Sequence, residues 1–239
     1  MLLGLWIASR RVKKQGYDPD VVSQICVWII LGGFSGARLV HVFAYRWVDY
    51  QDNLLDILKL WEGGLSSYGG FAGAALASVW FLKRSPHKFW PYADAVAFGF
   101  VPGWALGRVG CFAIHDHPGS LSDFFLAVEM VVKPVGYDSP LIQARHDLGL
   151  YDGFLALGMA IVFFIAAKKP RHNGFYIGWM CIMYAPARFL LDFVRATDLT
   201  VSDARYLHLT PAQYGSIILL LIGGWVIWKH RDTPQHSSS

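Results

Sequence analysis

The sequence predicts an all-α polytopic membrane protein, and two observations support this class. The 239 residues are 54% hydrophobic and only 16% charged, whereas a soluble domain usually carries about 25% charged residues. Long stretches without any charge also recur along the chain, and about 20 largely apolar residues suffice for a helix to span a bilayer. Disordered, collagen-like and coiled-coil proteins are excluded by the same composition.

Six stretches are long and apolar enough to be full spanning helices. They cover residues 21–45, 63–82, 92–114, 148–167, 174–195 and 206–228. Residues 1–9 are apolar but too short to cross a bilayer. We expect them to be the second half of a truncated first helix, or else a re-entrant or peripheral segment. Residues 1–231 would then form a single transmembrane helical domain, followed by a disordered tail over 232–239.

Lysine and arginine collect at alternate connections between the predicted spans. Residues 10–14, 83–88, 168–171 and 229–231 hold 12 of the 21 positive charges. Positively charged connections stay in the cytoplasm, so the C-terminus is expected there. The opposite side then carries the connection 115–147, in which we expect a small periplasmic element. The net charge of +4 forms no basic stripe on a polar face, so nucleic acid is not an expected partner.

Three arginines, Arg38, Arg108 and Arg188, lie in the interior of the predicted spans, where a charge costs about 2.5–3.5 kcal/mol on insertion scales. Arg188 precedes Asp192 by one helical turn, so the two can pair on one helix face. Arg38 lies near a helix end and can snorkel, whereas Arg108 has no carboxylate within one turn. The alternative is an inward-facing anion site, in which these guanidinium groups hold a phosphate.

Glycines accompany these charges. Gly69 and Gly73 form a G-x-x-x-G pattern, which allows close packing of helices. The same segment starts a helix, and its free N–H groups are an alternative site for an anionic ligand. Gly107 and Gly110 flank Arg108, and Pro102 precedes it by six residues. An interrupted, glycine-flanked helix with a buried arginine is typical of a functional site.

Histidines and aspartates gather at the outer ends of the spans, as His115-Asp116-His117 and His146-Asp147. Three interpretations stay open. These residue types bind zinc or iron. A histidine beside a carboxylate also suits general acid–base catalysis. The third interpretation is a polar cluster at the membrane interface, in which each aspartate orients a histidine by a hydrogen bond.

Five stretches, in order along nearly the whole chain, resemble the prolipoprotein diacylglyceryl transferase family. They are RRVKKQGYDPDVV with LGGFSGARLVHVFAY, EGGLSSYGGFAGA, PGWALGRVGCFAIHDHPG, PARFLLDFVRATD and LTPAQYGSIILLLIGG. The second and third are the most specific, because they are similar to the family segments G-G-[ML]-S-x-H-G-G and G-R-x-G-N-F-x-N. The resemblance implies seven spanning helices with the N-terminus outside.

The resemblance also implies an activity in the bacterial inner membrane. Family members move the diacylglyceryl group of phosphatidylglycerol onto the thiol of a lipobox cysteine, so that glycerol phosphate leaves and a thioether forms. The implied partners are phosphatidylglycerol, the signal-peptide and lipobox region of prolipoproteins, and membrane lipids. The implied site faces the outer leaflet and the periplasm, and no cofactor is implied.

The matching positions acquire expected roles from the resemblance. Arg108 is implied to bind the lipid phosphate, and Arg188 to act on the headgroup. The positions expected to contact substrate are Arg38, Gly69, Gly70, Gly107, Gly110, Asp116, His146, Asp192 and Arg195.

Two positions depart from the family pattern. Tyr68 stands where the family has its proposed basic histidine, and Cys111 replaces the signature asparagine. A tyrosine, with an unperturbed pKa of about 10, is a poor base near neutral pH. We therefore expect His115 or His117 to accept the thiol proton, with Tyr68 as the less favoured candidate.

Other functions stay open alongside this one. The chain could be a divergent paralogue with another acceptor, or a phospholipid or peptide binder without transferase activity. A metal-dependent membrane enzyme is a further alternative, and it requires His115, Asp116, His117 and His146 to converge.

Overall fold

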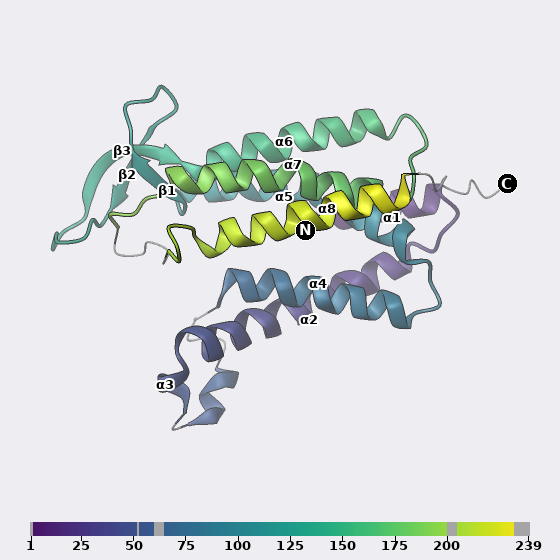
Figure 1. Ribbon diagram of the computed structural model, residues 1–239, viewed down its shortest axis with the longest axis horizontal. Helices are drawn as coiled ribbons and strands as arrows, with labels where there is room; N and C mark the ends of the chain where they lie inside the picture. The colour runs from purple at the N-terminus through teal and green to yellow at the C-terminus, as the bar shows by residue number, and fades with distance from the viewer. Residues whose placement is uncertain (1, 52, 60–64, 200–204, 232–239) are drawn as a thin grey trace. The chain divides into compact units, whose positions relative to one another are not determined.

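The chain is mostly helical in the computed structural model, which describes residues 2–51, 53–59, 65–199 and 205–231 (Figure 1). Five helical segments among the described residues are long and apolar enough to cross a membrane. They are Asp20–Phe43, Phe89–Ile114, Leu148–Ala166, Phe175–Val194 and Pro211–His230. The prediction of a polytopic helical membrane protein is therefore confirmed in its coarse form.

The chain divides into two compact units, one of residues 1–11 and 93–239 and the other of residues 12–92. The first unit contains the start of the chain and the described elements from residue 93 onward. Its elements are the first part of α1 (Leu2–Lys14), most of α5 (Phe89–Ile114), β1 (Pro118–Leu121), β2 (Val128–Val132), β3 (Leu141–Asp147), α6 (Leu148–Ala166), α7 (Phe175–Leu191) with the 3-10 turn η4 (Asp192–Val194), and α8 (Pro211–His230).

Aromatic and aliphatic side chains form the core of the first unit. Phe98 of α5, Met159 and Phe163 of α6 and Tyr176 of α7 are almost fully buried in one cluster. Lipid is as apolar as these side chains, so their van der Waals packing, rather than removal from water, stabilises the contact between the helices. This core holds α5, α6 and α7 together. Polar side chains near the outer ends of these helices can therefore contact one another.

A three-stranded antiparallel sheet, ordered β1-β3-β2, lies beyond the ends of α6 and α7 (Figure 1). The sequence predicted a folded element near 115–147 without specifying its structure. The hydrophobic alternation of a half-buried strand is missing from β3, because its buried positions carry Arg145 and Asp147. A strand whose inward side chains are charged gives no period-2 hydrophobic signal.

The second unit is built on the packing of α2 (Asp20–Val40) against α4 (Ser67–Arg84), joined through η1 (His41–Tyr45), α3 (Trp47–Tyr50) and η2 (Leu54–Leu58). A Cβ atom on Gly36 would lie 2.3 Å from the Gly69 carbonyl oxygen, and one on Gly73 would lie 2.1 Å from that of Gly32. No side chain fits there, so the close-packing interpretation of the G-x-x-x-G pattern is confirmed.

Two predicted spans differ from the five membrane-length helices. Helix α4 has 18 residues and ends in Lys83 and Arg84, and it is not one of the five among the described residues. Helix α1 has 13 residues and continues through the basic segment that follows the apolar residues 1–9. The seven-helix count and the single domain over 1–231 stay predictions, and the predicted tail 232–239 lies outside the described residues.

Candidate active site

The centre of the candidate site is an ion pair between two spanning helices. Arg108 of α5 places Nη2 2.7 Å from Oδ2 of Asp152 on α6, and the two side chains are only 15% and 6% exposed. Glycines on α6 permit this approach. A Cβ atom on Gly153 would lie 3.4 Å from Cβ of Arg108, and one on Gly149 would lie 3.3 Å from the backbone nitrogen of Phe112. The carboxylate that Arg108 lacks on its own helix is therefore supplied by the neighbouring helix.

This ion pair leaves polar atoms unused. Asp152 Oδ1 and Arg108 Nε are both buried, and neither has a hydrogen-bond partner among the described residues. A buried polar atom without a partner costs about 1–3 kcal/mol, so native proteins usually pair such atoms. Arg108 therefore retains a donor beyond its contact with Asp152.

Arg188 occupies a second ion pair at the junction of α7 and α8. Its Nη1 lies 2.6 Å from Oδ1 of Asp192, as the spacing in the sequence predicted. The other oxygen of this fully buried carboxylate accepts the Thr210 hydroxyl. Thr210 is the N-cap of α8 and forms a capping box with Gln213. Arg188 and Asp192 thus help to hold the end of α7 against the start of α8.

The two arginines share one electrostatic environment. The carboxylate of Asp152 lies in the electrostatic fields of both Arg108 and Arg188. Tyr184 of α7 interacts with both arginines as well. That Arg108 and Arg188 act together in one substrate site stays a prediction.

A tight reversal at His115 brings the outer histidines back toward the arginine. The backbone of His115 is left-handed, with φ of 49°, a conformation that non-glycine residues rarely adopt. It ends α5, and the Asp116 N–H donates to the Cys111 carbonyl oxygen at 3.4 Å. The chain therefore turns back over the last turn of the helix that carries Arg108.

His117 lies beside Arg108 as a result of this reversal. Its Nδ1 is hydrogen-bonded to Asp116, and its Nε2 lies 3.4 Å from Nη1 of Arg108. The side chains of His117 and Asp116 are 30% and 39% exposed, so the pair is accessible. The same Nη1 lies 3.6 Å from Sγ of Cys111.

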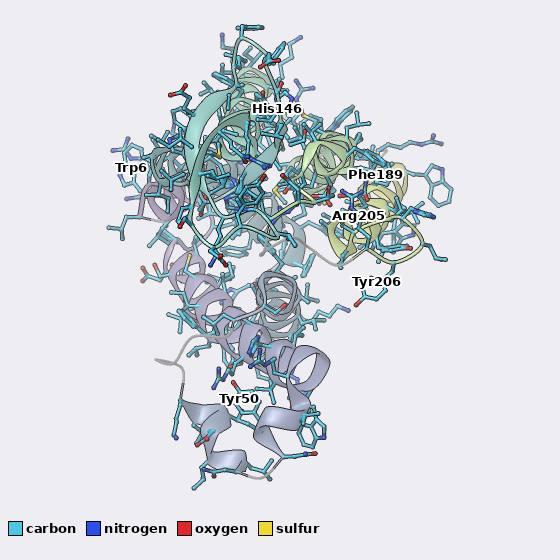
Figure 2. All side chains as sticks on the ribbon, turned by 90° about the vertical axis from the view of Figure 1, so that its left-hand side faces the viewer. Trp6, Tyr50, His146, Phe189, Arg205 and Tyr206 are labelled. Atoms are coloured by element: carbon cyan, nitrogen blue, oxygen red, sulfur yellow. The ribbon has the colours of Figure 1, made fainter. Side chains whose placement is uncertain are left out.

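The other two histidines have different partners. His115 Nδ1 lies 2.7 Å from Oδ2 of the fully buried Asp147. Asp147 also caps α6 by accepting the Leu150 N–H at 3.1 Å. His146 (Figure 2) is hydrogen-bonded to the Tyr151 hydroxyl at 2.6 Å.

The three histidines thus have separate hydrogen-bond partners, since His115 contacts Asp147, His117 contacts Asp116 and His146 contacts Tyr151. The four residues required by the metal-enzyme alternative, which are His115, Asp116, His117 and His146, do not form one donor cluster among the described residues.

Comparison with known proteins shows the family to which the chain belongs. The family model described as prolipoprotein diacylglyceryl transferase matches residues 1–229. The chain belongs to the prolipoprotein diacylglyceryl transferase family.

Curated relatives carry the matching name. The phosphatidylglycerol–prolipoprotein diacylglyceryl transferase of Pseudomonas savastanoi pv. phaseolicola is 32% identical over 243 residues, which cover 99% of this chain and 88% of the relative. The enzyme of the same name from Pseudomonas syringae pv. tomato has the same identity and coverage. That of Pseudomonas entomophila is 31% identical over 231 residues, or 94% of this chain and 84% of the relative.

The glycines of the family signature border open space. A Cβ atom on Gly107 or Gly110 would meet no atom within 4 Å, so internal packing does not require glycine at either position. Arg195, another position expected at the substrate, forms an isolated backbone bridge with Gly119 of β1. It therefore lies where the segment after α7 meets the sheet.

Arg38, in the second unit, has a structural role that the sequence did not reveal. The side chain is 3% exposed and donates to the carbonyl oxygens of Asp56, Ile57 and Lys59 at 2.7, 2.8 and 3.1 Å. Its guanidinium group also lies 5.1 Å from the centre of the Tyr50 ring. Arg38 thus stabilises the end of η2 through backbone hydrogen bonds and does not snorkel. Its contact with substrate stays a prediction.

The remaining expected residues lie in the glycine-rich segment of the family. Gly69 packs against α2, as described above, whereas a Cβ atom on Gly70 would lie at ordinary distances of 3.6 Å from Ala37 and Gly33. The side chain of Tyr68 lies outside the described residues. Substrate contact by Gly69, Gly70 and Tyr68 therefore stays a prediction.

The sequence marked Tyr151-Asp152 only as a weak polar candidate and did not link Asp152 to Arg108. Asp152 follows Tyr151 in a weakly polar stretch before a long apolar run, and no local spacing links it to Arg108. The one available signal was the pair Gly149 and Gly153 around it, since small residues four apart permit close helix contacts.

Proposed function

We propose that this chain transfers the diacylglyceryl group of phosphatidylglycerol onto the thiol of the lipobox cysteine of a prolipoprotein, forming a thioether. One observation carries the proposal beyond family membership. The Arg108 guanidinium group lies 3.4 Å from Nε2 of His117. A group that stabilises a leaving phosphate therefore lies beside one that can accept a thiol proton.

Arg108 is the proposed phosphate-binding residue. The leaving glycerol phosphate gains negative charge as the glyceryl C–O bond breaks, and preorganised donors stabilise such charge. The unpaired Nε of Arg108 is a donor available for this purpose. Asp152 orients the guanidinium group, and Arg188 adds a second positive charge to the same environment.

His117 is the favoured base of the two candidates. Its Nδ1 is engaged by Asp116, so Nε2 is the nitrogen that can accept the proton. His115 is instead committed to the buried Asp147. The neutral imidazole of His117 takes the thiol proton, and the sulfur attacks the sp3 glyceryl carbon. The C–O bond breaks, and glycerol phosphate leaves with the electron pair.

The site is proposed to face the outer leaflet and periplasm of the bacterial inner membrane, with the C-terminus in the cytoplasm. The distribution of lysine and arginine supports this orientation. The sheet of β1, β2 and β3 then lies on the periplasmic side. Phosphatidylglycerol from the outer leaflet and the lipobox segment of a secreted preprotein both reach the site there, and His146 and Arg195 are proposed to assist in binding them.

Thioether formation on a lipobox peptide tests the proposal directly. The purified protein is reconstituted with phosphatidylglycerol, and the product is measured by mass spectrometry. Arg108→Ala should lower the rate by about 10²–10³-fold, the usual effect of losing one transition-state donor. Arg108→Lys should rescue poorly, because the planar fork is lost.

The matched control for these variants is Arg84→Lys, since Arg84 is an exposed residue at the end of α4. It should keep the full rate. Undiminished turnover by a correctly inserted Arg108→Ala protein would refute the phosphate role. Binding of phosphatidylglycerol without any thioether product would identify a binding protein instead.

A further inference from the structure

The short 3-10 helix η2, in the second unit, has a polar face and an apolar face. In a 3-10 helix the side chains of residues i and i+3 eclipse one another. On the polar face, Asn53 Nδ2 donates to Asp56 Oδ1 at 3.0 Å, and Lys59 Nζ lies 2.7 Å from the same oxygen. Leu55 and Leu58 share another face and are 72% and 70% exposed. The polar side chains are thus paired with one another, while the leucines are open.

Other large apolar side chains are exposed in the same connection between α2 and α4. Val48 and Leu54 are more than half exposed, and Trp47 is exposed as well. The Trp47 ring stacks on Phe43, also exposed, with 5.3 Å between the ring centres. Exposed apolar groups gathered in this way mark a surface that meets a protein or a membrane, and tryptophan is enriched at membrane interfaces.

Arg38 fixes η2 at the depth of a membrane boundary. It lies in the last turn of α2, within the membrane-length segment Asp20–Phe43. Its buried side chain donates directly to the carbonyl oxygens of Asp56, Ile57 and Lys59. The end of η2 therefore lies within one side-chain length of the end of a spanning helix. Backbone outside a helix is tolerated at this depth only where protein groups satisfy it, and Arg38 supplies these donors.

We infer that the leucine face of η2, formed by Leu55 and Leu58, inserts between the headgroups and acyl chains of the leaflet at which α2 ends. The partner is the phospholipid surface itself, because the element continues directly from a spanning helix and is amphipathic. Such elements bury their apolar face by about 5–10 Å. In the proposed orientation this leaflet is the outer one. The inference concerns a surface of the second unit and goes beyond the proposed function.

Photocrosslinking of the full chain in vesicles of phosphatidylethanolamine and phosphatidylglycerol tests this anchor, without any acceptor peptide. Leu55→benzoylphenylalanine places a photoreactive group on the leucine face. Asn53→benzoylphenylalanine is the matched control, because Asn53 is exposed on the polar face of the same short helix. We expect the Leu55 variant to form phospholipid adducts, joined through the acyl chain in mass-spectrometric fragmentation, with a several-fold higher yield than the Asn53 variant.

Removal of the Arg38 donors tests how the depth is set. Arg38→Gln should lower the yield of lipid adduct at Leu55 several-fold. The same probe at Leu31, an exposed residue of α2, should keep its yield if that helix still spans the bilayer. Equal adduct yields at Leu55 with and without Arg38 would overturn its role. If Arg38→Gln loses both adducts, the Leu55 variant with Arg38 intact still decides whether the anchor exists.

Three results would overturn the anchor. A crosslink from Leu55 to another segment of the chain would show that the protein covers this face. A crosslink that forms only with added lipobox peptide would identify a peptide site, and equally low lipid yields at Leu55 and Asn53 would leave the leucine face in water. Thioether formation is measured separately in the same vesicles. Lipid adducts without any turnover would therefore defeat the proposed function and leave the anchor standing.

Discussion

Two neighbouring histidines, His115 and His117, are exposed to the same degree, at 31% and 30%, but their aspartate partners differ in burial. His115 is bonded to Asp147, which is fully buried and also caps α6. His117 is bonded to Asp116, and both of these side chains are partly exposed beside Arg108. The residue types are identical, so burial and additional partners separate a structural pair from a reactive one.

The difference has a physical cause. A buried carboxylate that accepts two hydrogen bonds is costly to disturb, because removal of either donor leaves a buried oxygen without a partner. A carboxylate in contact with water can change its partner at little cost. The first kind of pair is suited to holding the α5–sheet–α6 junction, and the second to exchanging a proton.

The largest expected effect comes from replacing His117, the histidine beside Arg108. His117→Gln should lower thioether formation by about 10²–10⁴-fold, the usual contribution of a general base, while the unfolding temperature in detergent stays unchanged. The matched variant His115→Gln should keep most of the activity in the same mass-spectrometric assay. Loss of turnover in His115→Gln alone would reverse the two roles.

The next effect is on stability and belongs to the buried pair. Asp147→Ala removes a helix cap worth about 1 kcal/mol and a buried hydrogen bond whose loss costs about 1–3 kcal/mol. The variant should therefore unfold at lower temperature, with a total loss of about 2–4 kcal/mol. The free energy of unfolding of Asp116→Ala should stay within about 0.5 kcal/mol of the wild type. An equal loss of stability in Asp147→Ala and Asp116→Ala would show that the two aspartates do not differ in structural role.

Glycine substitutions sharpen the contrast between the buried and open sides of the site. A Cβ atom on Gly149 would lie 3.0 Å from Oδ1 of Asp147 and 3.3 Å from the Phe112 nitrogen, whereas one on Gly107 would meet nothing within 4 Å. Gly149→Ala should destabilise the protein by about 1–3 kcal/mol through overpacking, and Gly107→Ala should leave the unfolding temperature unchanged. Reduced thioether formation by Gly107→Ala alone would indicate that substrate uses this open space.

The smallest effect concerns a third carboxylate, on the segment that packs beside the sheet. The hydrogen bond from the buried Arg145 holds the pKa of the Asp198 carboxyl below its usual range. The resulting stabilisation is present above the unfolded pKa of about 3.9 and is lost as the pH falls through the lower folded pKa. Because Asp198 is 45% exposed, solvent screening keeps the effect small.

Unfolding midpoints measured from pH 7 down to pH 3 check this linkage. The wild type should lose stability at acid pH slightly more steeply than Asp198→Asn does. Parallel curves for the two proteins would show that the ion pair between Arg145 and Asp198 contributes nothing to the free energy of unfolding.

The residue pattern determined the class of the protein, because a bilayer demands long uncharged stretches whatever their packing. It also predicted Arg108 as a site residue. A charge within a spanning stretch is costly, and an arginine flanked by glycines there is typical of a functional site. It could not distinguish Arg38 from Arg108. Arg38 donates to backbone carbonyl oxygens and is buried, while Arg108 pairs with a carboxylate and keeps a free donor.

Those distinctions arose from contacts between segments that are distant in the sequence. Asp152 meets Arg108 only because glycines let α6 approach α5. His117 reaches the same arginine only through the left-handed turn at His115. Hydrophobic periodicity and motif spacing report on a single segment at a time, whereas the partner, burial and exposure of each charged group depend on how the helices and the sheet pack together.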